Sequence, residues 1–331
     1  MSALPDVAAP LDEAEALAAF GDILDGQVSD KDIARFLVAL SDRGETASEI
    51  AGAARAMRAR MIRVAAPASA IDVCGTGGDG HHTLNVSTAV ALVVAAAGVP
   101  VAKHGNRAAS SKAGAADTLE ALGLDLDRAA ETAEATLADL GIGFLFAARH
   151  HPAMARIMPI RRAIGRRTIF NLIGPLANPA GVGRQLLGIA RPDYVPIYAE
   201  ALARLGIERA MVVSGDEGLD ELSLAGGNAV ARIDGASVTI GRVEPGEAGL
   251  PSAPVSAIRG GDAAHNAAAL RALLQGEPSA YRDAVIFNAA AALIVADAAR
   301  DWREAAEEAA EVIDRGLANT LLDCWIATVQ R

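Results

Sequence analysis

A glycine-rich segment at residues 72–80, with the sequence DVCGTGGDG, carries the clearest chemical signal in the chain. Its glycines are at positions 75, 77, 78 and 80, directly after a short apolar run. Glycines are costly in conformational entropy unless the backbone must turn sharply or lie close to a ligand. A glycine loop that leads into a helix presents free N–H groups and the positive end of the helix dipole, which suit phosphate. We therefore predict a phosphate site, with a purely structural turn as the alternative.

A second polar segment, KHGNRAASSK at residues 103–112, follows the apolar run 99–102. It brings together three cations, Lys103, Arg107 and Lys112, with an imidazole, an amide and two hydroxyls. In open parallel sheets, ligands bind beyond the carboxyl ends of the strands. A basic loop alone is ordinary solvated surface, but two polar loops after two strands favour a site for a polyanion.

An acidic turn, SGDEGLDE at residues 214–221, follows another apolar run. Acidic residues in a turn are usually solvated. In phosphate sites, however, Mg²⁺ is typically shared between one or two carboxylates and the phosphate oxygens. Asp220 and Glu221 are therefore candidate ligands of Mg²⁺.

His151 and Arg161 form a further candidate group, on a segment predicted to be largely helical. At a rise of about 1.5 Å per residue, these two side chains lie about 15 Å apart if one helix includes both. They cannot hold one small group together, but they could line an extended pocket.

The elements that must position these residues are short predicted strands that alternate with predicted helices, which is typical of an α/β domain with a largely parallel sheet. The predicted strands are 70–74, 99–103, 143–146, 185–190 and 209–214, with 229–233 and 237–241 as a later pair. The predicted helices are 87–97, 112–122, 128–140, 152–164, 192–205 and 266–274, and two or three more lie between 281 and 329.

The N-terminal segment has a different pattern and is predicted to be helical over 11–24, 30–40 and from Thr46 onward. Thr46 and Glu49 form the S/T-x-x-E capping-box pattern of a helix start. A linker is predicted at 65–68. The Gly-Pro and Asn-Pro pairs within 174–179 predict a rigid crossover in place of a helix.

The composition argues against nucleic-acid and membrane partners. The formal net charge is −11 and aromatic residues make up 3% of the 331 residues, so a general positive field and base-stacking rings are lacking. The longest apolar run, Ala89 to Ala97, is well short of the ~20 residues of a membrane span. Cys74 and Cys324 have no neighbouring cysteine and the N-terminus has no secretory pattern, so we expect a cytoplasmic protein.

Taken in order, these segments closely resemble the anthranilate phosphoribosyltransferase family over nearly the whole chain. The markers are GTGGDG at 75–80, NVST at 85–88, KHGNRAASSKAG at 103–114, FNLIGPLANP at 170–179 and LDELSLAG at 219–226. The resemblance implies transfer of the 5-phosphoribosyl group from 5-phosphoribosyl-1-diphosphate (PRPP) to the amine of anthranilate in tryptophan biosynthesis, with Mg²⁺ as cofactor. The alternatives are a pyrimidine nucleoside phosphorylase-like enzyme and a non-catalytic relative that binds nucleic acid.

The resemblance also implies roles for individual residues. Those that match the family's PRPP-binding positions are Gly75, Gly78, Asp79, Thr83, Asn85, Val86, Ser87, Thr88, Lys103, His104, Gly105, Asn106, Arg107, Ala108, Ala109, Ser110, Ser111 and Ala115. Those that match its anthranilate contacts are Gly75, Asn106, Arg161 and His151, and those that match its Mg²⁺ ligands are Ser87, Asp220 and Glu221. No residue is assigned as a covalent nucleophile or as a base.

The family's fold is a small all-helical domain joined to a larger α/β domain with a central, mostly parallel sheet flanked by helices. The resemblance places the small domain at 1–66 plus about 166–180, and the large domain, with the PRPP and magnesium site, at 67–165 and 181–331. Because family members commonly associate through the small domain, we expect a homodimer.

Overall fold

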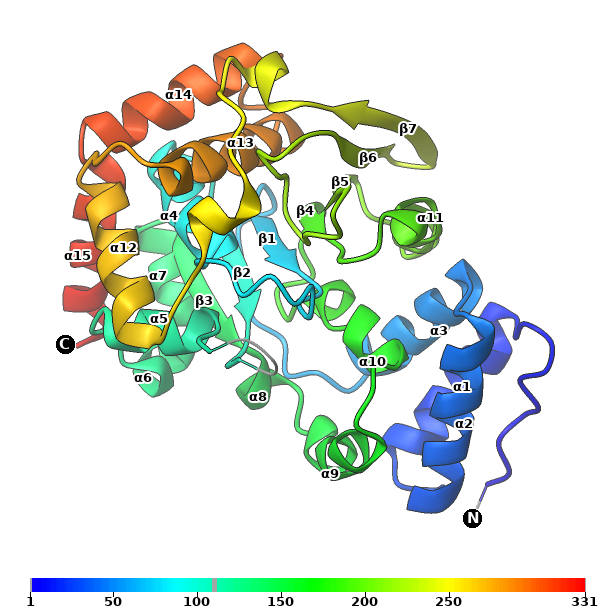
Figure 1. Cartoon of the computed structure of the whole chain (residues 1–331). Coiled ribbons are helices and arrows are strands. Elements are labelled where there is room, and N and C mark those ends of the chain that lie inside the picture. Colours follow the sequence, from blue (N-terminus) through cyan, green and yellow to red (C-terminus); the bar gives the residue numbers. More distant parts are fainter. Residues whose placement is uncertain (1, 109–111, 331) are drawn as a thin grey trace.

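A sheet of seven strands occupies the centre of the molecule, in the order β3-β2-β1-β4-β5-β6-β7 (Figure 1). The computed structural model describes residues 2–108 and 112–330. The strands are β1 (Ile71–Gly75), β2 (Val101–Gly105), β3 (Ile142–Phe146), β4 (Arg184–Gly188), β5 (Arg209–Gly215), β6 (Asn228–Asp234) and β7 (Ser237–Val243). The first five run parallel, and β6 and β7 are added antiparallel, so the predicted fold class and all seven predicted strands are confirmed.

The register of the parallel strands brings their carboxyl ends to one edge of the sheet. Gly75 at the end of β1 pairs with Gly188 at the end of β4, and Gly105 at the end of β2 pairs with Phe146. The acidic turn after β5 crosses this edge so closely that a Cβ at Gly75 or Gly188 would overlap Asp220. Glycine at the ends of β1 and β4 therefore lets the acidic turn lie directly against the start of the glycine loop.

Helices cover both faces of this sheet (Figure 1). They are α4 (Val86–Ala96), α5 (Ala115–Ala121), α6 (Leu126–Glu131), α7 (Ala133–Asp139), α11 (Val195–Arg204), α12 (Ala263–Leu274), α13 (Ala280–Val295), α14 (Trp302–Asp314) and α15 (Leu317–Val329). Two further helices, α8 (Ala147–His150) and α9 (Met154–Ile164), follow β3 in the chain. Within the described residues, no helix combines the length and the apolar character needed to cross a bilayer.

One predicted helix is divided in the structure, and the predicted crossover includes a short 3₁₀ turn. The helix predicted over 128–140 is divided into α6 and α7 at Thr132, whose hydroxyl donates a hydrogen bond to the Arg128 carbonyl at 2.8 Å and so competes with the regular backbone pattern. The crossover expected at 174–179 contains a 3₁₀ turn at Pro175–Ala177, preceded by the short helix α10 (Ile169–Leu172). Proline is compatible with the first position of such a turn, because no N–H is needed there.

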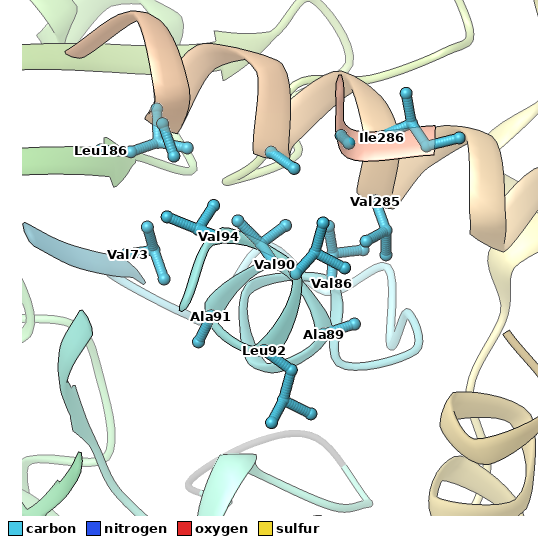
Figure 2. Packing of buried hydrophobic residues seen from close by; sticks show 14 of the residues in the cluster. Val73, Val86, Ala89, Val90, Ala91, Leu92, Val94, Leu186, Val285 and Ile286 are labelled. Atoms are coloured by element: carbon cyan, nitrogen blue, oxygen red, sulfur yellow. The ribbon is translucent and has the colours of Figure 1, made fainter. Parts of the chain in front are cut away.

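Helix α4 is the central packing element of the α/β part, and it begins at the site. Figure 2 shows its apolar side chains between Val73 and Leu186 of the sheet on one side and Val285 and Ile286 of α13 on the other. Because residues on all sides of α4 are buried, its sequence lacks a polar face. The position of its first turn is therefore fixed by the core.

The N-terminal helices α1 (Glu13–Leu24), α2 (Asp30–Arg43) and α3 (Ala47–Arg58) form a helical domain to one side of the sheet (Figure 1). The predicted capping box of Thr46 and Glu49 is confirmed at the start of α3. Helix α9 packs against α1 and α2. The ring of Phe170 in α10 meets Phe20 edge-on at 5.8 Å, so residues distant in sequence complete this domain's core.

Candidate active site

The glycine loop after β1 presents unpaired backbone donors at the carboxyl edge of the sheet. Gly77, Gly78 and Gly80 have φ angles of 68°, 75° and 79°, which residues with a Cβ rarely adopt. Within the described chain, the N–H groups of Gly78, Asp79 and Gly80 have no hydrogen-bond acceptor. Consecutive N–H groups in such a conformation form a concave site for an anion.

The acidic turn after β5 is bonded directly to this loop. The N–H of Gly77 donates to Oδ2 of Asp220 at 2.6 Å, and the N–H of Ser87 in α4 donates to Oε1 of Glu221 at 3.2 Å. The turn is fixed from beneath by Asn288 of α13, whose side chain hydrogen-bonds both the N–H and the carbonyl of Leu222. The structure thus brings the candidate metal ligands Ser87, Asp220 and Glu221 to the glycine loop.

Two carboxylates of the turn, Asp220 and Glu221, are stabilised in their protonated form. Lost hydration is the largest cause and raises the pKa of Asp220 to about 7 and that of Glu221 to about 8, although both side chains keep some contact with solvent. The negative charge of Asp79 raises the pKa of Asp220 further, and that of Asp220 raises the pKa of Glu221. Two ionised carboxylates that are partly dehydrated repel each other, and a bound cation would relieve this repulsion.

The donor atoms at this turn fit Mg²⁺. They are carboxylate and hydroxyl oxygens, the hard ligands that Mg²⁺ prefers. Across residues 2–108 and 112–330, no cluster of three or more His, Cys, Asp or Glu side chains is arranged to hold a metal alone. In phosphate sites, the coordination of Mg²⁺ is usually completed by substrate phosphates and water.

Lys103 lies beneath the site and is buried. Its Nζ donates to the Val73 carbonyl at 2.7 Å and to Oγ of Ser87 at 3.2 Å, and it is one of the charges that lower the pKa of Glu221. A buried cation in this position offsets part of the negative charge of the acidic turn.

Arg107 and Ala108 of the second polar loop are bound by carboxylates of α5. Nη1 of Arg107 donates to Asp117 at 3.0 Å and to Glu120 at 2.8 Å, and the N–H of Ala108 donates to Asp117 at 2.9 Å. Asn106 accepts a hydrogen bond from the N–H of Arg107. Ala115 is the first residue of α5. The predicted site residues Ala109, Ser110 and Ser111 lie outside the described residues.

The first turn of α4 carries four of the predicted PRPP-binding residues. Asn85 is hydrogen-bonded to three other helices, because Thr118 and Asn266 donate to its Oδ1 and the hydroxyl of Tyr281 donates to its carbonyl. The side chains of Val86 and Thr88 are buried, so only their backbone is available to a ligand. The fourth, Ser87, contacts Glu221 and Lys103, and Thr83 upstream forms an isolated bridge to Arg259.

His104 and His151 meet on the opposite side of β2 from Lys103. Their Nε2 atoms are 3.3 Å apart, and both rings are buried. Burial is the main cause that lowers the pKa of His104 to about 3 and that of His151 to about 4, so both imidazoles are neutral near pH 7. Arg161 lies on α9, where it contacts the sulfur of Met158 at 3.7 Å and where burial lowers its pKa.

Sequence reasoning missed several residues that organise the site, because their side chains come from distant elements. Asn288, Asn266 and Tyr281 lie in apolar helices at the far end of the chain. Arg167, between α9 and α10, donates to two carbonyls of the glycine loop. A single polar residue inside an apolar helix, such as Asn288, is the one signal that was present in the sequence.

Comparisons with known proteins agree with this arrangement. Two family models match the chain, "Glycosyl transferase family, helical bundle domain" at residues 8–61 and "Glycosyl transferase family, a/b domain" at residues 67–319. A protein named anthranilate phosphoribosyltransferase from Novosphingobium aromaticivorans is 76% identical over 330 residues, which covers 100% of both chains.

Solved structures are similar over the same length. Anthranilate phosphoribosyltransferase from Thermus thermophilus has 44% identity and a TM-score of 0.93, with 98% of each chain covered. The enzyme from Saccharomyces cerevisiae, in complex with PRPP and Mg, has 30% identity and a TM-score of 0.88, with 97% of this chain and 94% of that chain covered. These relatives support neither the phosphorylase nor the nucleic-acid-binding alternative, and the chain belongs to the anthranilate phosphoribosyltransferase family.

Proposed function

We propose that this protein transfers the 5-phosphoribosyl group of PRPP to the amine of anthranilate, giving N-(5-phosphoribosyl)anthranilate and diphosphate. The observation that carries the proposal is the hydrogen bond between the Gly77 N–H and Asp220, which joins a loop of unpaired N–H donors to a pair of carboxylates. Donors for phosphate and ligands for Mg²⁺ therefore lie side by side, as a diphosphate leaving group with a bound metal requires.

PRPP would bind along the edge formed by the glycine loop, the first turn of α4 and the second polar loop. Backbone N–H groups of Gly78 and Asp79 and the start of α4 supply neutral donors, while Lys103 and Arg107 supply positive charge. The other residues proposed to line this site are Gly75, Thr83, Asn85, Val86, Ser87, Thr88, His104, Gly105, Asn106, Ala108, Ala109, Ser110, Ser111 and Ala115.

Ser87, Asp220 and Glu221 are proposed to hold Mg²⁺, which when bound supplies positive charge to the departing diphosphate. The two carboxylates must lose their protons to bind it, and Lys103 keeps Ser87 in place through its hydrogen bond. Asn106 and Arg161 would hold the anthranilate carboxylate, with Gly75 and the neutral His151 beside the ring.

Attack of the amine on C1 of the ribose would expel diphosphate with inversion at that carbon. The ring passes through an oxocarbenium-like state, so catalysis comes from alignment of the amine and from stabilisation of the departing charge. No covalent nucleophile is needed, and no protein base is assigned to the amine proton.

The domain division and the assembly belong to the same proposal. Residues 1–66 with about 166–180 form the small domain, which is supported by the contact of Phe170 with Phe20, and 67–165 with 181–331 form the large one. We propose a cytoplasmic homodimer that associates through the small domain, where Leu17 of α1 is an exposed large apolar side chain. Sedimentation equilibrium of the purified protein tests the dimer, and a single monomeric species would contradict it.

The direct test of function uses the fluorescence of anthranilate. Adding PRPP and Mg²⁺ to the protein with anthranilate should remove the fluorescence with time, and omission of either PRPP or Mg²⁺ should prevent the loss. Product identity is confirmed by mass spectrometry. Folded protein that leaves the fluorescence unchanged under all conditions contradicts the proposed function.

A further inference from the structure

Arg167 contacts the glycine loop from outside the set of residues given a role above. Its Nη2 donates to the Gly77 carbonyl at 3.0 Å, and its Nη1 lies 3.4 Å from the Gly78 carbonyl. The neighbouring Arg166 pairs with Asp42 at 2.6 Å, whereas no carboxylate among the described residues forms an ion pair with Arg167. The guanidinium of Arg167 is therefore engaged by two backbone carbonyls.

Those two carbonyls belong to the peptide units that end in the free N–H groups. In a trans peptide, the carbonyl of one residue and the N–H of the next point in opposite directions. A guanidinium that holds the carbonyls of Gly77 and Gly78 on one side therefore directs the N–H groups of Gly78 and Asp79 to the other side. The two glycines have positive φ angles and no Cβ to restrict them, so their peptide orientation needs an external support.

The backbone of Arg167 is itself anchored to the helical domain. Its carbonyl accepts a hydrogen bond from the Ser41 hydroxyl of α2 at 3.1 Å. The next residue, Thr168, is the N-cap of α10, where its N–H donates to Asn171 at 3.1 Å. The side chain that reaches the glycine loop is thus delivered from the other domain by a fixed backbone.

We propose that Arg167 is a positioning residue for PRPP, which holds the Gly77 and Gly78 peptides so that the N–H groups of Gly78 and Asp79 face the diphosphate. The inference rests on the proposed function, because it takes the glycine loop as the diphosphate site. It also makes diphosphate binding depend on contact between the two domains.

Three variants test this role. In Arg167→Ala the peptides lose their support. Arg167→Lys keeps the charge, but one ammonium group cannot bind two carbonyls in the planar fork that a guanidinium offers. Arg166→Ala is the matched control, because it removes a neighbouring arginine whose partner is Asp42 rather than the glycine loop. Steady-state kinetics give kcat and the KM of each substrate, and calorimetry with Mg²⁺ and inorganic diphosphate gives the affinity for the leaving group.

We expect Arg167→Ala to raise the KM for PRPP and the Kd for diphosphate by about tenfold or more, the loss typical of charge-assisted hydrogen bonds. The KM for anthranilate should stay within about twofold, Arg167→Lys should restore less than half of the lost affinity, and Arg166→Ala should match the wild type. Unchanged diphosphate binding in Arg167→Ala, full rescue by lysine, or an equal rise in both KM values would overturn the proposal.

The failure of this inference is distinguishable from the failure of the proposed function. If the wild-type protein binds PRPP and consumes anthranilate while Arg167→Ala does the same with wild-type constants, only the positioning role is wrong. If the wild-type protein binds neither PRPP nor diphosphate, the proposed function itself is wrong. Should Arg167→Ala fail to fold, as judged by its melting temperature, the comparison of Arg167→Lys with the wild type decides.

Discussion

Two loops follow neighbouring parallel strands of the sheet, and they offer an anion different kinds of donor. The glycine loop after β1 has no cationic side chain within 75–80, but it holds backbone N–H groups that have no acceptor among residues 2–108 and 112–330. The polar segment 103–112, which begins within β2, is rich in cations, yet Lys103 is buried and bonded to Val73 and Ser87, and Arg107 is paired with Asp117 and Glu120. The N–H groups of the first loop are therefore free to bind an anion within the described chain, whereas Lys103 and Arg107 already have partners.

The difference indicates which loop does more for the leaving group. Preorganised N–H dipoles stabilise developing charge without rearrangement during the reaction. A guanidinium that is already paired must leave or share its carboxylates before it can bind a phosphate, which reduces its net contribution. We therefore expect changes at the glycine loop and its acidic partner to affect activity more than changes at Arg107.

The largest effect should follow removal of the carboxylates that join the glycine loop. Replacing both Asp220 and Glu221 by Ala removes the proposed Mg²⁺ ligands, and we expect kcat/KM for PRPP to fall by about a hundredfold or more. Circular dichroism and the melting temperature check that the protein remains folded. Unchanged steady-state rates at saturating Mg²⁺ would contradict the assignment of these two residues.

Alanine substitutions at Gly75 and Gly77 distinguish two reasons for glycine in this loop, which are close contact with Asp220 and a positive φ angle. A Cβ at Gly75 would overlap the Asp220 carboxylate, whereas a Cβ at Gly77 meets no atom within 4 Å and suffers only from a φ of +68°. We expect Gly75→Ala to weaken Mg²⁺-dependent PRPP binding about tenfold, and Gly77→Ala to cost roughly 1 kcal/mol of stability. Isothermal titration and thermal unfolding measure the two effects. Equal losses of PRPP affinity would remove the distinction.

The sequence predicts the parts of this site that are local. The glycine loop, the basic loop and the acidic turn follow apolar strands, so the position of each relative to the sheet could be inferred from its neighbours in the chain. What the sequence does not reveal is the partner of each group. From the sequence alone, Arg107 is predicted to be a free cation, but the structure pairs it with Asp117 and Glu120. Arg167 has no distinguishing feature in the sequence, but in the structure it binds the glycine loop. Such pairings depend on tertiary packing, which local patterns do not encode.

The state of the acidic turn should depend on pH and Mg²⁺. The pKa values of Asp220 and Glu221 are raised, so these two groups hold more protons in the folded protein than in the unfolded chain, and stability falls as pH rises from the ordinary carboxyl range toward about 7 to 8. Adding Mg²⁺ should reverse this trend and release protons, because only the ionised carboxylates bind the ion. Melting temperatures from roughly pH 5 to pH 8, with and without Mg²⁺, measure this pH dependence of stability. An Asp220→Asn, Glu221→Gln variant should show no effect of Mg²⁺.

The smallest effects should appear at Arg107, and their direction is informative. If the guanidinium must leave Glu120 to reach a phosphate, Arg107→Ala should raise the KM for PRPP by about two- to threefold, within the modest worth of an exposed ion pair. Glu120→Ala should lower that KM slightly, because it releases the guanidinium in advance. Asp117 should be left intact in this test, since it also accepts the N–H groups of Ala108 and Gly114 and so shapes the loop itself. Initial rates at varied PRPP concentration give the KM of both variants. If the KM for PRPP rises in Arg107→Ala and falls in Glu120→Ala, Arg107 leaves its ion pair when PRPP binds. If the KM rises in both variants, the ion pair instead stabilises the loop.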